Sequence, residues 1–356
     1  MDKKVSRRAF LKPMAGAASA SVVLFVGSIS LLGGSQSAPQ SSASRKSGWV
    51  LPRTADGRPD LEGVWENNSA TPLERPKQFA QKPMLSDQEL ADLERRAARL
   101  LGPEAEAVFG DALYTTLLAN TPPPGLQATG SYSQNWLPNR YFEHRTSLII
   151  DPADGRLPPL TAAGIKRRTA VRGFGAPASS AQDMSLQDRC IHYGFPDLFA
   201  AYMSVYRIVQ TPESVAIQME KIHDTRIIPL DGRPHAPATL RQYLGDSRGR
   251  WDGDTLVVET RNFHPDGNPM GGYSVLSDEN LHLTERFRRT AEDTIEYTFT
   301  VDNPTMWTKP WTAMIPWKRS RGELHEYACH EGNYSLRGML SAARAEESRR
   351  RSPVRD

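Results

Sequence analysis

Residues 220–232, EKIHDTRIIPLDG, concentrate the ionisable side chains that acid–base chemistry requires. Glu220, Lys221, His223, Asp224 and Arg226 fall within one stretch that the surrounding apolar alternation predicts to be a β-strand. Ionised groups that face a core must be paired with an opposite charge or change their pKa. Two interpretations stay open: a polar ligand site inside a barrel, or a structural ladder of ion pairs at a strand edge.

If the stretch is a site, its chemistry is general acid–base catalysis. We expect His223 to be the acid or base, with Asp224 or Glu220 fixing its tautomer. Arg226 is expected to stabilise a developing negative charge.

A second cluster, CHEGN at 329–333, supplies His330 and Glu331. We expect both to lie opposite His223 in one shared catalytic site. His223, Asp224 and His330 are also the residues that a divalent metal would use. However, short ligand spacings such as HxH or HExxH are absent, so no cofactor is predicted.

The two cysteines, Cys190 and Cys329, are an even number in a chain with an export signal, which favours a disulfide. The alternative is two separate buried thiols. A disulfide requires Cα atoms within about 7 Å, and it would leave no thiolate for catalysis. It would also bring the neighbouring His192 towards His330.

Five residues are expected to contact a substrate: His144, Arg145, His192, Trp136 and Arg248. Aromatic surfaces beside carboxylates suit ring-shaped or carbohydrate-like ligands, although core packing is their commoner use. Asp246 and Arg248 flank the start of a hairpin, where turn chemistry is also common. The weaker candidates are His235, His264, His282 and His325.

The chain begins with a basic segment, an apolar stretch and a small polar stretch, the pattern of an export signal. Arg7 and Arg8, in SRRAFLK, resemble a twin-arginine signal, so we predict a signal at 1–38 and a flexible linker at 39–56. A membrane anchor is the alternative, since about 18 apolar residues can just span a bilayer.

The formal charge of +3 falls to −1 once the signal's five basic residues and one aspartate are removed, which argues against nucleic acid as a partner. The protein is therefore expected to be periplasmic or secreted, with the export machinery as a partner and no stable anchor in the mature form.

The elements that must position these residues are mainly β-strands. One helix is predicted over 85–102, where Ser86 and Glu89 form a capping box. From 203 onward, turns such as Asp252–Gly253–Asp254 separate alternating segments, the pattern of antiparallel hairpins, and a last pair is predicted from WTAMIPWKR and LHEYACHE. We predict a mainly β fold: an antiparallel meander closing into a barrel or a strongly curved sheet, with a helical N-terminal insertion. The expected parts are a strand, helix and loop region at 57–200, the barrel at 201–343 and a disordered basic tail at 344–356.

The blocks GRPDLEGVW, HDTRIIPLDGRPH, GDSRGRWDGDTLVVETRNF and EYACHEGN resemble those of a family of exported bacterial proteins of unassigned activity. The resemblance spans about 50–346 and implies a common fold without a reaction. The opening GxW-like strand and the meander are similar to the lipocalin architecture, an analogy of fold alone. The sequence thus favours an exported lyase or hydrolase that acts on a small organic or carbohydrate-like substrate. The alternatives are a lipocalin-like binding protein and a structural module of the cell envelope.

Overall fold

The computed structural model describes residues 48–102, 105–108, 111–123, 133–134, 137, 140–170, 178–198, 203–267, 270 and 275–351. All of these residues belong to the compact unit Pro39–Asp356. The predicted signal, Trp136 and the side chain of His223 lie outside this description, so the predictions that concern them are untested. Within the described ranges, no helix combines the length and the apolar character that spanning a bilayer requires.

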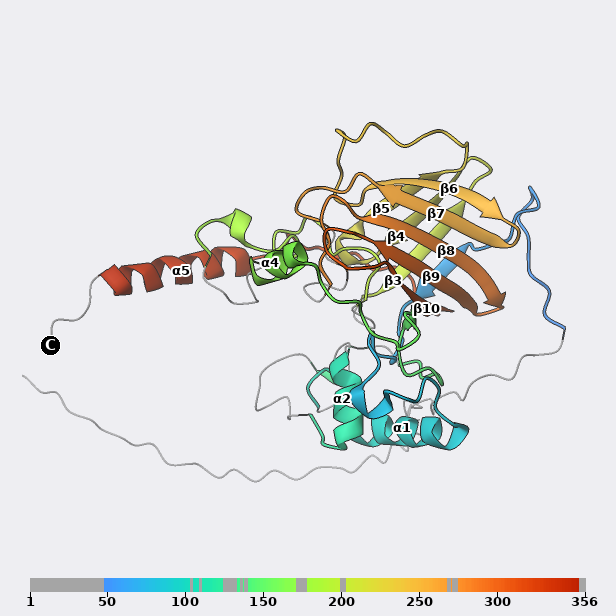
Figure 1. Cartoon of the computed structure of the whole chain (residues 1–356), viewed down its shortest axis with the longest axis horizontal. Helices are drawn as coiled ribbons and strands as arrows, with labels where there is room; N and C mark the ends of the chain where they lie inside the picture. The colour runs from blue at the N-terminus through green and yellow to red at the C-terminus, as the bar shows by residue number, and fades with distance from the viewer. Residues whose placement is uncertain are drawn as a thin grey trace, which may run out of the picture. The chain divides into compact units, whose positions relative to one another are not determined.

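One antiparallel sheet dominates the fold and curves into a nearly closed barrel, as predicted (Figure 1). Its strands are β1 (Gly63–Glu66), β2 (Ile149–Asp151), β3 (Val205–Gln210), β4 (Ser214–Met219), β5 (Thr225–Pro229), β6 (Asp246–Asp252), β7 (Thr255–Arg261), β8 (His282–Ala291), β9 (Thr294–Asp302) and β10 (Trp311–Arg319). Their order is β5-β4-β3-β1-β10-β9-β8-β7-β6, and β2 pairs with β10. The predicted hairpins β3–β4, β6–β7 and β8–β9 are confirmed.

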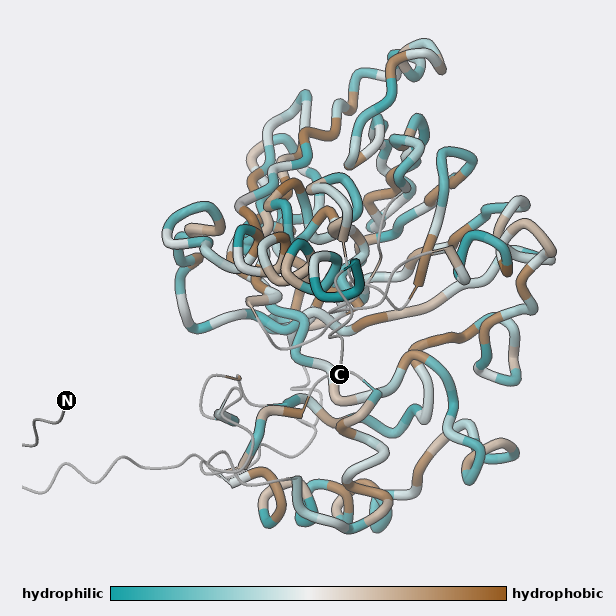
Figure 2. The backbone as a smooth tube through the Cα atoms, turned by 90° about the vertical axis from the view of Figure 1, so that its left-hand side faces the viewer, coloured by the Kyte–Doolittle hydropathy of each residue, from teal (hydrophilic) through white to brown (hydrophobic). Residues whose placement is uncertain are grey.

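The helices are α1 (Asp87–Leu100), α2 (Asp111–Ala119), α4 (Ala162–Ala170) and α5 (Ser335–Arg351), with short 3-10 turns at η1 (Lys77–Phe79), η3 (Ala181–Asp183) and η4 (Lys221–His223). The predicted capping box of α1 is present: the hydroxyl of Ser86 accepts from the backbone N–H of Glu89, and the Glu89 carboxylate accepts from that of Ser86. Leu90, Leu93, Ala97 and Leu100 form its buried face. Hydrophobic and hydrophilic residues follow each other at short intervals along the chain (Figure 2), and in β8 and β9 every second residue is buried, which gives these strands one core-facing side.

The charged stretch is a turn, which corrects the prediction of one continuous strand. β4 ends at Met219, η4 follows, Ile222 takes a left-handed φ of 56°, and β5 then pairs back onto β4. The reason is the alternation of faces: Met219 and Arg226 are both buried, yet seven positions apart they would lie on opposite faces of an unbroken strand. The turn between the two strands allows both side chains to be buried.

Three further expectations are corrected. No strand forms at LHEYACHE; instead β1, from the other end of the chain, pairs with both β10 and β3. Residues 344–351, predicted as a disordered tail, continue α5, and Arg344 donates to the carbonyls of Ala178 and Ser179. Within the predicted flexible linker, Arg53 pairs with Pro59 and lies 2.8 Å from Asp254.

Side chains close the barrel between its two edge strands, β5 and β6, which lie side by side (Figure 1). Arg226 of β5 donates to the hydroxyl of Ser247 on β6 at 3.1 Å. Gly249 of β6 packs against Ile228 so closely that an added Cβ would come within 2.8 Å of its methyl carbon. A glycine is therefore required for this close approach.

The described interior of the barrel is packed rather than hollow. Tyr206 stacks on Trp317 with ring centroids 4.2 Å apart, Tyr297 lies 4.8 Å from the same indole, and Phe195 contacts Tyr297 from a loop. A void beside Phe195 and Arg226 leaves no room for a water molecule. The polar, solvent-filled interior expected from the sequence is therefore not found among these side chains.

Candidate functional site

Arg226, the expected anion stabiliser, is committed to a buried ion pair inside the barrel. Its two terminal nitrogens lie 3.0 and 2.5 Å from the oxygens of Glu285, and the hydroxyls of Ser247 and Thr260 accept from it at 3.1 Å. Burial opposes its charge, but the attraction of Glu285 outweighs burial and raises the pKa of Arg226. Tyr297 donates to the same carboxylate at 2.8 Å. Because these partners satisfy both charges, the arrangement suits structure better than substrate binding.

Lys221 forms the second buried pair of the charged stretch. Its ammonium lies 2.7 Å from Asp197 and 3.1 Å from the hydroxyl of Ser204, and it sits 4.3 Å from the centre of the Tyr193 ring. Burial lowers the pKa of Lys221 against the opposing attraction of Asp197. The lysine therefore has a structural partner as well.

Glu220 links the charged turn to the C-terminal segment. It is buried and accepts a hydrogen bond from the backbone N–H of His325 at 3.0 Å. The expected proximity of these two segments is thus present. His330 and Glu331, however, are exposed, whereas Arg226 is buried in the barrel, so the structure does not gather these three into one site. Asp224 ends η4, where its carbonyl accepts from the backbone N–H of Met219.

The disulfide between Cys190 and Cys329 is confirmed, with Cα atoms 5.7 Å apart. His192, expected to contact substrate, is buried: its Nδ1 accepts from the backbone N–H of Gly194 at 3.1 Å. Burial, helped by the charge of His264, lowers the pKa of His192 to about 4. The ring is therefore neutral near pH 7.

His144 and Arg145 lie away from the barrel interior and have local partners. The Nδ1 of His144 lies 2.9 Å from the carbonyl of Leu85, and Arg145 pairs with Glu143 while donating to the carbonyl of Met314. The contacts described for His144 and Arg145 do not include Arg226.

The structure instead brings together residues from two of the quoted sequence blocks, on the outer face of β6. His235 Nδ1 lies 3.0 Å from Asp246 Oδ2, and Arg248 Nη1 lies 2.6 Å from the other oxygen of that carboxylate. Burial would raise the pKa of Asp246, but the N–H of Ala236, His235 and Arg248 together lower it. An ionised aspartate that accepts from Nδ1–H fixes the histidine tautomer and leaves Nε2 as a proton acceptor.

Three hydrogen bonds hold the loop that carries His235. The backbone N–H of Ala236 donates to Asp246 at 2.9 Å, and Arg248 Nε donates to the carbonyl of Pro234 at 3.0 Å. From β7's end, Asn262 donates to the carbonyl of Ala236 at 2.9 Å. The histidine is thus positioned from both neighbouring strands, and its side chain remains 22% exposed.

A second histidine lies beside this pair. The register pairs Asp246 of β6 with Arg261 of β7, and Arg261 Nε donates to His282 Nε2 on β8 at 3.1 Å. Burial, the charge of Arg261 and, more weakly, that of His235 lower the pKa of His282. His282 is therefore neutral near pH 7, and since its Nε2 accepts, its proton lies on Nδ1.

Sequence reasoning treated His235 and His282 as weak candidates and kept only Arg248 from this cluster. A signal was present: in β6 the alternation puts Asp246 and Arg248 on one face, away from the buried Ser247 and Gly249. What the sequence did not reveal is that the loop before β6 folds back so that His235 meets Asp246.

Among the side chains that the structure describes, no three His, Cys, Asp or Glu residues are arranged to hold a metal ion. Because the His223 side chain is outside that set, the metal set of His223, Asp224 and His330 remains a prediction. Comparisons with known proteins give no match: no family model, no curated protein and no solved structure corresponds to this chain.

Proposed function

We propose that this protein is an exported enzyme that carries out acid–base chemistry, as a lyase or hydrolase, at the His235–Asp246 pair. The observation that carries the proposal is the 3.0 Å contact between His235 Nδ1 and Asp246 Oδ2 on a partly exposed loop. Asp246 orients the imidazole and stabilises the imidazolium that forms when Nε2 takes a proton from water or from a substrate carbon.

The neighbouring groups fit the second requirement of such a reaction, a stabiliser for developing negative charge. The Nδ1–H of neutral His282 is a donor, and Arg261 is exposed and donates to His282 from Nε. A small organic substrate with a carbonyl or carboxylate group would place its oxygen towards these donors.

The test is a screen of the purified chain against carboxylic esters, lactones, glycosides and β-elimination substrates. Turnover by the wild type that falls at least a hundredfold in Asp246→Asn, with KM little changed, supports the proposal, because asparagine favours the wrong tautomer. Partial recovery of turnover in Asp246→Glu distinguishes this positioning effect from a disrupted structure of the loop that carries His235. Full turnover in Asp246→Asn contradicts it.

Export by the twin-arginine route is proposed on the SRRAFLK segment and is supported by the disulfide, which is typical of oxidising compartments. Replacing Arg7 and Arg8 with lysine should leave the precursor in the cytoplasm. Normal export of that variant would contradict this route.

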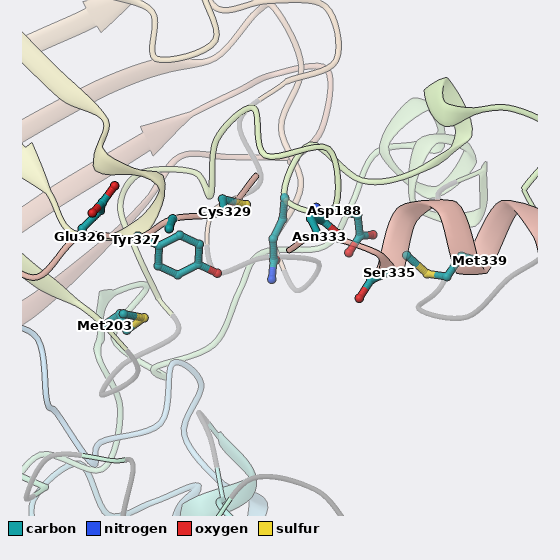
Figure 3. A pocket seen from close by; sticks show the side chains of 10 residues that line it. Asp188, Met203, Glu326, Tyr327, Cys329, Asn333, Ser335 and Met339 are labelled. Carbon is teal, nitrogen blue, oxygen red and sulfur yellow. The ribbon is translucent and has the colours of Figure 1, made fainter. Parts of the chain in front are cut away.

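A second function, non-catalytic binding of a small molecule, is supported by a separate observation. An open hollow of about 410 Å³ lies beside the disulfide (Figure 3), within the size range of ligand sites. It is distinct from the His235–Asp246 pair, because none of the residues of that pair lines it.

A further inference from the structure

A row of ionisable side chains crosses the outer face of four neighbouring strands, β6 to β9 (Figure 1). Asp246 of β6 lies opposite Arg261 of β7. Arg261 Nε donates to His282 of β8, and His282 lies opposite Asp302 of β9. Adjacent strands lie about 4.8 Å apart, so each group is one strand spacing from the next. Arg261 is therefore one strand away from the His235–Asp246 pair.

We propose that Arg261 binds a carboxylate group of the substrate, so that the substrates are short-chain carboxylic acids such as hydroxy- or oxo-acids. The inference rests on the proposed acid–base function of the His235–Asp246 pair and gives it a substrate class. A guanidinium presents its N–H donors in a planar fork that matches the two oxygens of a carboxylate. Because such hydrogen bonds are charge-assisted, an anionic substrate is preferred over a neutral one of the same shape.

The hydrogen bond that Arg261 makes to His282 does not compensate its charge. The acceptor, His282 Nε2 at 3.1 Å, belongs to an imidazole that is neutral near pH 7, because burial and the charge of Arg261 lower the pKa of His282. This bond uses Nε and not the terminal nitrogens of the guanidinium. Arg261 is also exposed, so a ligand in solution can reach it.

Two carboxylates on the same face of the sheet have cationic partners of their own. Arg248 Nη1 lies 2.6 Å from Asp246 Oδ1, and Arg250 Nη1 lies 3.1 Å from Glu259 Oε1. These partners balance the charges of Asp246 and Glu259, so the positive charge of Arg261 remains for a ligand.

Asp302 works against an anionic ligand. It lies two strands from Arg261, about 10 Å at the usual strand spacing, which is about one Debye length in 0.1 M salt. Screening therefore weakens its repulsion without removing it. Asp302→Asn should strengthen carboxylate binding by up to about twofold.

The reacting part of the substrate follows from the position of Arg261 relative to His235. The charge of His235 contributes to the lowered pKa of His282, so the two histidines lie within electrostatic range of each other. A carboxylate held by Arg261 places an atom a few bonds away across about one strand spacing, where His235 Nε2 can take its proton. The substrate is thus an acid whose reacting carbon lies close to its carboxylate.

An NMR titration of the full-length chain, labelled at the histidine rings, with lactate tests the proposal. Lactamide, which has nearly the same shape without the charge, is the matched probe, and the ionic strength is held constant. We expect lactate to shift the ring signal of His282 in a saturable way and lactamide to leave it unchanged. Arg261→Gln should weaken lactate binding about tenfold, since a charge-assisted hydrogen bond in a partly solvated site is lost.

Arg286→Gln is the matched control variant. It removes another exposed arginine from the outer face of β8, four residues along the strand from His282, and lactate affinity should stay unchanged. Absence of saturable lactate binding, equal binding of lactamide, or unchanged affinity in Arg261→Gln overturns the carboxylate assignment.

Turnover distinguishes failure of this inference from failure of the proposed function. With a carboxylic acid substrate from the screen and its methyl ester, His235→Gln should reduce turnover of both, whereas Arg261→Gln should raise KM about tenfold more for the acid than for the ester. Turnover without preference for the acid means that only the substrate class is wrong. Saturable lactate binding without turnover of any substrate means that the carboxylate site stands and the acid–base function fails.

Discussion

The barrel interior and the outer face of β6 contain the same kinds of ionisable group in opposite settings. Inside, the side chains of Arg226 and Glu285 are at most 3% exposed and form two hydrogen bonds with each other. Outside, Asp246 orients His235, whose ring keeps 22% of its surface accessible. Burial with complete pairing makes a charged group part of the structure, whereas partial exposure with one fixed partner leaves it able to exchange a proton. The density of charge in a sequence does not by itself distinguish the two.

The largest effect that would test this comparison is on the buried pair. Glu285→Ala leaves Arg226 charged and without its main partner, so we expect the free energy of unfolding to fall by about 3–5 kcal/mol. Replacing both residues with methionine should cost much less, because no charge is stranded. Urea unfolding measures each variant. A cost below about 1 kcal/mol for Glu285→Ala would mean that the interior pair is not structural.

The pH dependence of the free energy of unfolding provides a second test of the comparison, because His192 is buried whereas His235 is partly exposed. Its folded pKa of about 4 lies below the unfolded value of about 6.5, so the unfolded chain binds more protons in this interval. The stabilising contribution is complete above pH 6.5 and is lost as the pH falls towards 4, by about 3 kcal/mol.

In His192→Asn this contribution is absent. The stability difference between wild type and variant should therefore shrink by about 3 kcal/mol between pH 7 and pH 4. Urea unfolding at a series of pH values measures it. A difference that stays constant with pH would show that His192 titrates normally in the folded protein.

The smallest effect is expected at exposed ion pairs on the outer face. Arg250 and Glu259 lie 3.1 Å apart across β6 and β7, and their side chains are 57% and 35% exposed. Glu259→Gln should change the free energy of unfolding by less than about 1 kcal/mol, and the change should vanish in high salt. A loss as large as that of Glu285→Ala would remove the distinction between the two faces.

Much of the fold could be predicted from the sequence because its signals are local. The capping box at Ser86 and the turn at Asp252–Gly253–Asp254 each act within a few residues, and α1 and the β6–β7 hairpin follow from them. The disulfide was predictable from compartment and cysteine count rather than from geometry.

The predictions that failed concern contacts between residues that are distant in the sequence. The closure by β1 joins Trp65 to Arg319 and Tyr206, and no local pattern near residue 65 specifies those partners. The charged stretch allows two interpretations from the sequence alone, a polar site or structural ion pairs, and only the contacts of Arg226 with Glu285 and of Lys221 with Asp197 decide between them. The pairing of His235 with Asp246 depends on the path of a loop, which hydrophobic periodicity does not determine.

The central claim, that the outer pair and not the charged turn performs chemistry, is tested most directly by two matched histidine variants. His235 and His144 are both partly exposed and both lie near a carboxylate, but that of His144, on Asp87, is fully solvated 3.5 Å away. With any substrate found in the screen, His235→Gln should reduce turnover by about a hundred- to ten-thousandfold, and His144→Gln should leave it unchanged. Undiminished turnover in His235→Gln, or no turnover by the wild type across the whole screen, would contradict the account.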